Sequence, residues 1–172
     1  MNTPRATRSD ALVLAALALS IALVRLFNCH EPPEWDVGTY LVVAHELNAG
    51  ERLYLDVWDS KPPAVYTTYA VAERIAGYGA RQVYLLSVVA AWITMIGVFV
   101  VGSAQGRAAG RWAALFWACT CFDPNLGADQ PNTEAFINAA IVWAIALLMR
   151  VDGKRRVWGM SVAVGEIGRA HV

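Results

Sequence analysis

Residues 83–101, VYLLSVVAAWITMIGVFVV, decide the fold class of this chain, because these nineteen consecutive residues carry no charged side chain. A helix of that length is about 28 Å long, which matches the roughly 30 Å hydrocarbon core of a bilayer. The whole chain of 172 residues is 57% hydrophobic and only 16% charged, whereas an average soluble domain carries about 25% charged residues. The stretch therefore predicts a membrane-spanning helix, and the composition predicts a membrane protein.

Three further apolar runs extend this prediction. They cover residues 11–27, 108–122 and 135–149. The first is interrupted only by Ser20 and Arg25 and would also suit a secretory signal peptide, although no small-residue cleavage pattern follows it. The last two are short for a full crossing and would also suit a buried helical hairpin of a soluble protein. After the stronger spans, we expect them to cross the membrane too.

The basic residues support one topology. Lys and Arg accumulate in the short cytoplasmic loops of membrane proteins. The basic residues before the first run, around the start of the third run and after the fourth run are Arg5, Arg8, Arg107, Arg111, Arg150, Lys154, Arg155 and Arg156. We therefore expect an all-α, multi-pass bundle of about four spans. Its amino terminus is cytoplasmic, and the loops 28–82 and 123–134 face outward.

The end of the chain departs from this pattern. Residues 157–164 read as a fifth span cut short, and residues 166–172, EIGRAHV, match one reading frame of a common sequencing-library adapter. The hypothesis is that the natural sequence stops near Gly165, and that residues 1–165 are the amino-terminal part of a longer membrane protein.

The loop 28–82 holds the residues with chemical potential. Apolar positions predict a helix over residues 38–48, which Gly50 ends. A second helix is expected over residues 64–75, with Pro63 suited to its first turn. Both helices are expected to lie at the membrane surface. Asp36 comes just after the Pro32-Pro33 break and should lie near that surface.

The order of residues in this loop resembles that of a known family. The residues that carry the likeness are Asp36, Tyr40, Gly50, Tyr54, Asp56, Asp59-x-Lys61-Pro62-Pro63, Tyr66 and Tyr69. This pattern resembles the first outer loop of GT-C membrane glycosyltransferases of the family 39 group, which includes protein O-mannosyltransferases and lipid A aminoarabinose transferases. Asn132-Thr133-Glu134 resembles their second loop more weakly. Many members carry Asp-Glu where this chain has Asp36-Val37.

The resemblance implies transfer of a sugar from a polyprenyl-phosphate carrier, with inversion, on the outer face of a bacterial-type inner membrane. The acceptor would be a lipid, a glycan or a protein. Such a reaction needs a base for the acceptor hydroxyl and positive charge for the departing phosphate. Asp36 is the candidate base and Lys61 the candidate phosphate partner. The remaining candidates for substrate binding are Asp59, Tyr40, Tyr66, Arg52 and Glu134, with Arg74 as a further cation.

Each candidate also has a structural interpretation. Asp36 would suit a helix cap, Asp59 a turn and Glu134 a helix-dipole charge. Trp35, Trp58, Tyr40 and Tyr66 would suit an interfacial aromatic belt as well as sugar stacking.

Other partners and functions were also weighed. No cofactor is expected, although a divalent cation bridging Asp36 and a lipid phosphate stays open. The formal net charge is zero, and nothing in the chain indicates a nucleic-acid partner. The alternative function is a non-catalytic multi-pass protein, such as a transporter segment or an assembly subunit.

Overall fold

The computed structural model describes residues 7–28, 31–123 and 129–150, and within these ranges the regular structure is entirely helical. The elements are α1 (Arg8–Asn28), α2 (Trp35–Ala49), α3 (Pro63–Ala76), α4 (Ala80–Gly102), the 3₁₀ turn η1 (Ser103–Gln105), α5 (Arg107–Thr120) and α6 (Thr133–Leu148). The predicted all-α class is therefore confirmed. The truncated fifth span and the adapter-like end lie outside the described residues.

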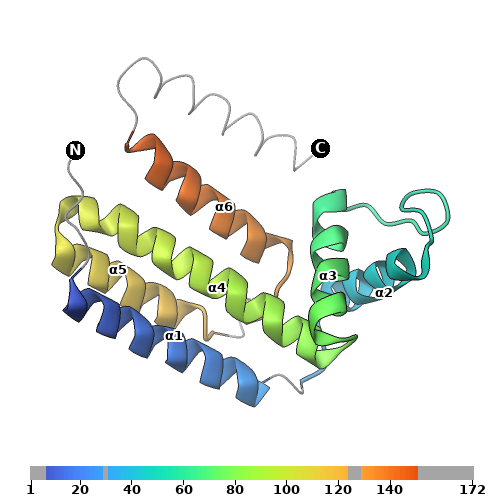
Figure 1. The fold of residues 1–172 in the computed structure, drawn as a ribbon, viewed down its shortest axis with the longest axis horizontal. Helices are drawn as coiled ribbons and strands as arrows, with labels where there is room; N and C mark the ends of the chain where they lie inside the picture. Colours follow the sequence, from blue (N-terminus) through green and yellow to red (C-terminus); the bar gives the residue numbers. More distant parts are fainter. Residues whose placement is uncertain (1–6, 29–30, 124–128, 151–172) are drawn as a thin grey trace.

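Helix α4 is the centre of the molecule. It contacts α1, α3, α5 and α6, and Figure 1 shows α1, α4, α5 and α6 lying side by side as a bundle. At one end of α4, α2 and α3 pack on each other, and α3 packs on α4. The described part of the connection from α1 to α4 is thus folded into a compact unit, which we call the α2–α3 unit.

Two clusters of buried side chains stabilise these parts. One lies between α2, α3 and the start of α4 and includes Val37, Tyr40, Tyr66, Tyr69 and Leu86. The other joins α1, α4 and α5 through residues that include Ile21, Met95, Phe99 and Ala114. Burial of such apolar area is the main driving force for packing in water. A bundle in a bilayer depends more on close van der Waals contact.

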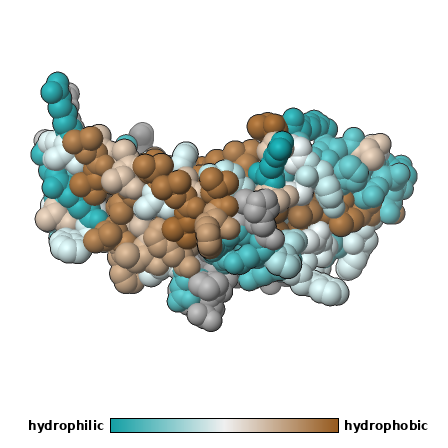
Figure 2. All heavy atoms as spheres, turned by 90° about the horizontal axis from the view of Figure 1, so that it is seen from below, coloured by the Kyte–Doolittle hydropathy of each residue, from teal (hydrophilic) through white to brown (hydrophobic). Residues whose placement is uncertain are grey.

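The outside of the bundle is apolar. Exposed large hydrophobic residues on its helices include Leu19, Leu23, Ile93, Trp112 and Phe116. In Figure 2 such residues gather over the long helices, with hydrophilic residues concentrated toward the ends of the molecule. An exposed apolar surface of this kind is typical of helices that face lipid.

Two helices have the length and apolar composition of a membrane span. They are Arg8–Asn28 and the helical stretch Ala80–Gln105. Helices α5 and α6 contain 14 and 16 residues, so each is shorter than the roughly 20 residues of a straight crossing. The predicted number of four spans therefore stays a prediction.

The predicted helix boundaries in the α2–α3 unit are close to those observed. Helix α2 begins three residues earlier than the predicted residue 38 and ends at Ala49, capped by Gly50, whose φ of 106° is left-handed. That conformation favours glycine because it has no Cβ. Helix α3 starts with Pro63 in its first turn, as predicted.

A buried carboxylate joins α1 to α5 at the end of the bundle opposite the α2–α3 unit. Asp10 is fully buried, and its Oδ1 lies 2.6 Å from Arg111 Nη2 and 2.7 Å from Nε. Arg107 is 4.0 Å away. Buried charges of this kind are tolerated when they are paired. Arg107 and Arg111 therefore also hold the two helices together.

Candidate active site

Asp36 is the second residue of α2, and its carboxylate forms an ion pair across the α2–α3 unit. Lys61 Nζ lies 3.1 Å from Asp36 Oδ2, with the Asp36 side chain 50% exposed and that of Lys61 34% exposed. The hydrogen bond to Asp36 is the main reason that the pKa of Lys61 is raised. The structure thus brings together the two residues that the sequence singled out, from positions 25 residues apart in the chain.

Tyr40 lies one helical turn after Asp36, so both side chains occupy the same face of α2. Its hydroxyl donates to Asp36 Oδ2 at 3.4 Å and is 2.8 Å from Thr133 Oγ1 at the start of α6. The ring is only 1% exposed, and burial raises the pKa of Tyr40. Tyr40 therefore links the Asp36 carboxylate to Thr133, the first residue of α6.

Asp59 fixes the backbone that carries Lys61. Tyr66 donates its hydroxyl to Asp59 Oδ2 at 2.6 Å and accepts the Lys61 backbone N–H at 3.1 Å. The Ser60 N–H binds Asp59 Oδ1 at 2.6 Å. Burial is the main cause of the raised pKa of Tyr66, and its hydrogen bond to Asp59 adds to it. These bonds position Lys61 at the entrance of α3.

Three buried tyrosine rings pack together next to the Asp36–Lys61 ion pair. Tyr40 packs edge-on against Tyr66 at a centroid distance of 5.9 Å and against Tyr69 at 5.5 Å. Tyr66 and Tyr69 are fully buried. The prediction that Tyr40 and Tyr66 present a ring to a sugar or to the headgroup belt does not agree with this burial, because packing of α2 on α3 covers both rings. Trp35 and Trp58 are 90% and 75% exposed, and both interpretations stay open for them.

The segment before α6 is hydrogen-bonded to the α2–α3 unit and to the turn that precedes α2. Tyr69 donates its hydroxyl to the Pro131 carbonyl oxygen at 2.7 Å, and the Glu34 backbone N–H donates to Gln130 Oε1 at 2.8 Å. Asn132 accepts from the Ala135 N–H and so caps α6.

Arg25 of α1 also binds the segment before α6. It is 5% exposed, and its guanidinium donates to the backbone carbonyls of Asp129 and Cys121. Sequence reasoning treated Arg25 only as an interruption in an apolar run. An ionisable residue inside an apolar helix often faces the protein interior and a functional site, and this signal could have identified it.

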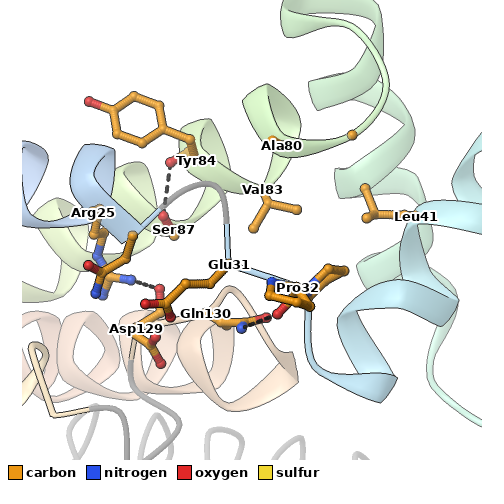
Figure 3. Close-up of a pocket in the computed structure, with 13 residues that line it drawn as sticks. Arg25, Glu31, Pro32, Leu41, Ala80, Val83, Tyr84, Ser87, Asp129 and Gln130 are labelled. Carbon is orange, nitrogen blue, oxygen red and sulfur yellow. Dashed lines mark hydrogen bonds between the residues drawn. The ribbon is translucent and has the colours of Figure 1, made fainter.

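Two cavities meet at this segment. One, of about 370 Å³, is lined by Asp36, Glu134, Asn132 and Asn138. The other, of about 310 Å³, lies beside the start of α4 and is lined by Glu31, Leu41, Val83 and Tyr84. Arg25, Ser87 and Gln130 line both. Figure 3 shows the second cavity, with Arg25, Glu31, Asp129 and Gln130 on one side and the apolar Leu41 and Val83 on another.

The cavity lining shows which carboxylates lie near Asp36 in a chain that has Val37 where many family members have Glu. Val37 is fully buried, so its position faces the core and not the cavity. Glu34 and Asp59, two other carboxylates of the loop 28–82, do not line the cavity that contains Asp36. Glu134 does line it, and it comes from the first turn of α6. The second carboxylate near Asp36 is therefore supplied by a distant part of the chain.

The predicted secondary cations lie apart from this site. Arg52 forms a two-point ion pair with Asp56, at 2.7 and 3.0 Å, in the exposed turn before Lys61. Arg74 donates to Asn48 Oδ1 at 2.8 Å. Neither lines either cavity. Among the described residues, no group of three His, Cys, Asp or Glu side chains is arranged to hold a metal ion.

Comparison with known proteins assigns the chain to the membrane glycosyltransferases of GT-C type. More particularly, residues 60–168 match the model of the dolichyl-phosphate-mannose-protein mannosyltransferase family, and because the match covers more than half of the chain, the protein belongs to this family. The match includes Lys61 and Glu134 but begins after Asp36. No curated protein and no solved structure matches the chain.

Proposed function

We propose that the protein transfers a sugar from a polyprenyl-phosphate carrier to a hydroxyl group of a lipid, glycan or protein acceptor. The observation that carries the proposal is the contact between Lys61 and Asp36, 3.1 Å apart, with Asp36 on the wall of a cavity that Glu134 also lines. Displacement of a phosphate by a hydroxyl requires a carboxylate to accept the hydroxyl proton and a cation to stabilise the leaving phosphate, and here both groups are partly exposed and in contact.

The proposed reaction is a direct displacement. Asp36 accepts the proton of the acceptor hydroxyl while the hydroxyl oxygen bonds to the anomeric carbon of the donor. The bond from that carbon to the phosphate oxygen breaks, and the polyprenyl phosphate leaves with the electron pair. Attack on the face opposite the leaving group inverts the anomeric centre.

Lys61 neutralises the departing phosphate in this scheme. Its raised pKa keeps the ammonium charged at neutral pH, and its flexible stem allows the charge to turn from Asp36 toward an arriving phosphate. That movement would release Asp36 from its ion pair when the donor is present. Glu134, which lines the same cavity, is proposed to bind sugar or acceptor hydroxyls.

We also propose the membrane placement that the sequence indicates. The protein would be a multi-pass protein of a bacterial-type inner membrane, with the α2–α3 unit on the outer face. This is supported by the apolar surface of the bundle and by the basic residues Arg107 and Arg111 at its opposite end. The exposed Trp35 and Trp58 would then lie in or near the interfacial region.

The test is transfer of labelled sugar from a panel of polyprenyl-phosphate donors, mannose included, in membranes that contain the protein. Asp36→Asn should lower kcat by about 10²- to 10⁴-fold, because a positioned general base contributes that much. Lys61→Ala should lower kcat and raise KM for the donor. The anomeric configuration of the product, read by NMR, tests inversion.

The control variants remove a carboxylate and a cation outside the proposed site. Asp56→Asn removes an exposed carboxylate that lines neither cavity, and Arg81→Ala removes an exposed cation at the start of α4. Both should transfer sugar as the wild type does. Transfer that survives Asp36→Asn would exclude Asp36 as the base, and no transfer from any polyprenyl-phosphate donor would contradict the proposed function.

A further inference from the structure

Consecutive residues of the segment 129–133 are tied to the rest of the site. Asp129 accepts from Arg25 of α1, Gln130 binds the backbone at Glu34, and Pro131 accepts from Tyr69 of α3. The last of the series, Thr133, reaches Tyr40 of α2. The segment is therefore held by three helices and by the turn that precedes α2, so its side chains have defined positions beside Asp36.

The contacts of Thr133 and Asp36 meet at a single hydroxyl group. The Tyr40 hydroxyl is 2.8 Å from Thr133 Oγ1 and 3.4 Å from Asp36 Oδ2. A phenol has one proton, and a carboxylate can only accept. When Tyr40 donates that proton to Asp36, Thr133 must be the donor in the shorter bond. The order of donation is then from Thr133 to Tyr40 to Asp36.

This chain of bonds acts on one oxygen of the carboxylate. Lys61 Nζ and the Tyr40 hydroxyl both contact Asp36 Oδ2, and within the described residues no contact to Oδ1 is seen. When Lys61 turns toward the donor phosphate, the contact from the buried Tyr40 stays, so it keeps Oδ2 occupied and leaves Oδ1 directed elsewhere. Chains of hydrogen bonds also polarise one another, so the Thr133 bond strengthens the Tyr40 bond.

We propose that Thr133 is a positioning residue that, through Tyr40, orients Asp36 so that Oδ1 takes the proton of the acceptor hydroxyl. The proposal rests on the proposed function, because it gives Asp36 the role of base. Thr133 itself touches neither donor nor acceptor. The start of α6 thereby controls the geometry of a base that belongs to α2.

The experiment is a double-mutant cycle on sugar transfer. Tyr40→Phe and Thr133→Val remove the two hydroxyls with little change in shape, and each should lower kcat about three- to tenfold, the worth of one hydrogen bond. In Thr133→Val, KM for the donor should stay unchanged. Because Thr133 acts only through Tyr40, the double variant should be no slower than Tyr40→Phe alone. Thr133→Ser, which keeps the hydroxyl, should restore the wild-type rate.

Two variants control for loss of a hydroxyl as such. Thr67→Val removes an exposed hydroxyl that bonds only to carbonyls of its own helix, and Tyr78→Phe removes one from an exposed tyrosine. Neither should change kcat. Rates are taken per amount of folded protein, measured by size-exclusion chromatography in detergent.

The outcomes separate this inference from the proposed function. A wild-type kcat in Thr133→Val, or effects that multiply in the double variant, would overturn the positioning role even if Asp36→Asn abolishes transfer. A loss in Thr133→Val that Thr133→Ser does not restore would also overturn it. Transfer that is insensitive to Asp36→Asn would instead refute the base on which the inference depends.

Discussion

Gly110 of α5 is the position where a single methyl group should most clearly test the packing of the bundle. A Cβ at this residue would lie 2.8 Å from the Phe99 carbonyl oxygen and 3.1 Å from the Ser103 backbone nitrogen, and closer still to Ser103 Oγ. Two of these atoms are backbone and cannot rotate away, so α4 and α5 would have to separate. Close approach at small residues is a common means of packing helices in membranes.

The expected cost of Gly110→Ala follows from these contacts. Overpacking of a well-packed interior costs about 1–3 kcal/mol, and contact with fixed backbone places this case near the upper value. Replacing a helical glycine by alanine returns about 1 kcal/mol of helix propensity. We therefore expect a net loss of about 2 kcal/mol in the free energy of unfolding.

Gly38→Ala is the matched control. Gly38 is also inside a helix, and no atom lies within 4 Å of its added Cβ, so only the propensity gain of about 1 kcal/mol should appear. The assay is reversible unfolding in mixed micelles with increasing SDS, followed by far-UV circular dichroism. A Gly110→Ala protein as stable as the wild type would refute the close contact between α4 and α5.

Two further predictions concern the α2–α3 unit. Tyr69→Phe should destabilise the protein by about 1–3 kcal/mol, because it leaves the buried Pro131 carbonyl without its donor; thermal unfolding in detergent measures this. His45 binds Glu73 at 2.7 Å, and this bond raises the pKa of His45 above its usual 6.5. Its contribution to stability should be full below about pH 6.5 and be lost as the pH rises through the raised pKa of the folded state.

The Tyr69 and His45 predictions each have a control. Tyr78→Phe removes a hydroxyl from an exposed ring and should leave the melting temperature unchanged; an equal loss in both variants would show that the Tyr69 bond is not the cause. For His45, the unfolding midpoint is compared between pH 5.5 and pH 8.5. His45→Gln should lose part of that pH dependence, and an unchanged profile would contradict the role of the pair.

Much of the fold could be predicted from the sequence because its signals are local. An uncharged run of apolar residues specifies a helix such as α4 by length and composition alone. Gly50 and Pro63 mark helix ends through backbone geometry, which depends on a few neighbouring residues. Asp36 and Lys61 were singled out mainly through the family resemblance, and their contact was not predicted, since their spacing along the chain carries no geometric information.

The tertiary structure alone decided which residues share the site. Glu134 and Thr133 approach Asp36 because α6 packs on α4 and the segment before α6 bonds to α2 and α3. Tyr40 and Tyr66 became core residues because the helices that carry them face each other. Such contacts join positions that are far apart in the chain, and they depend on the packing of whole helices. The sequence by itself determined the helices and the chemistry available, whereas helix packing determined where that chemistry comes together.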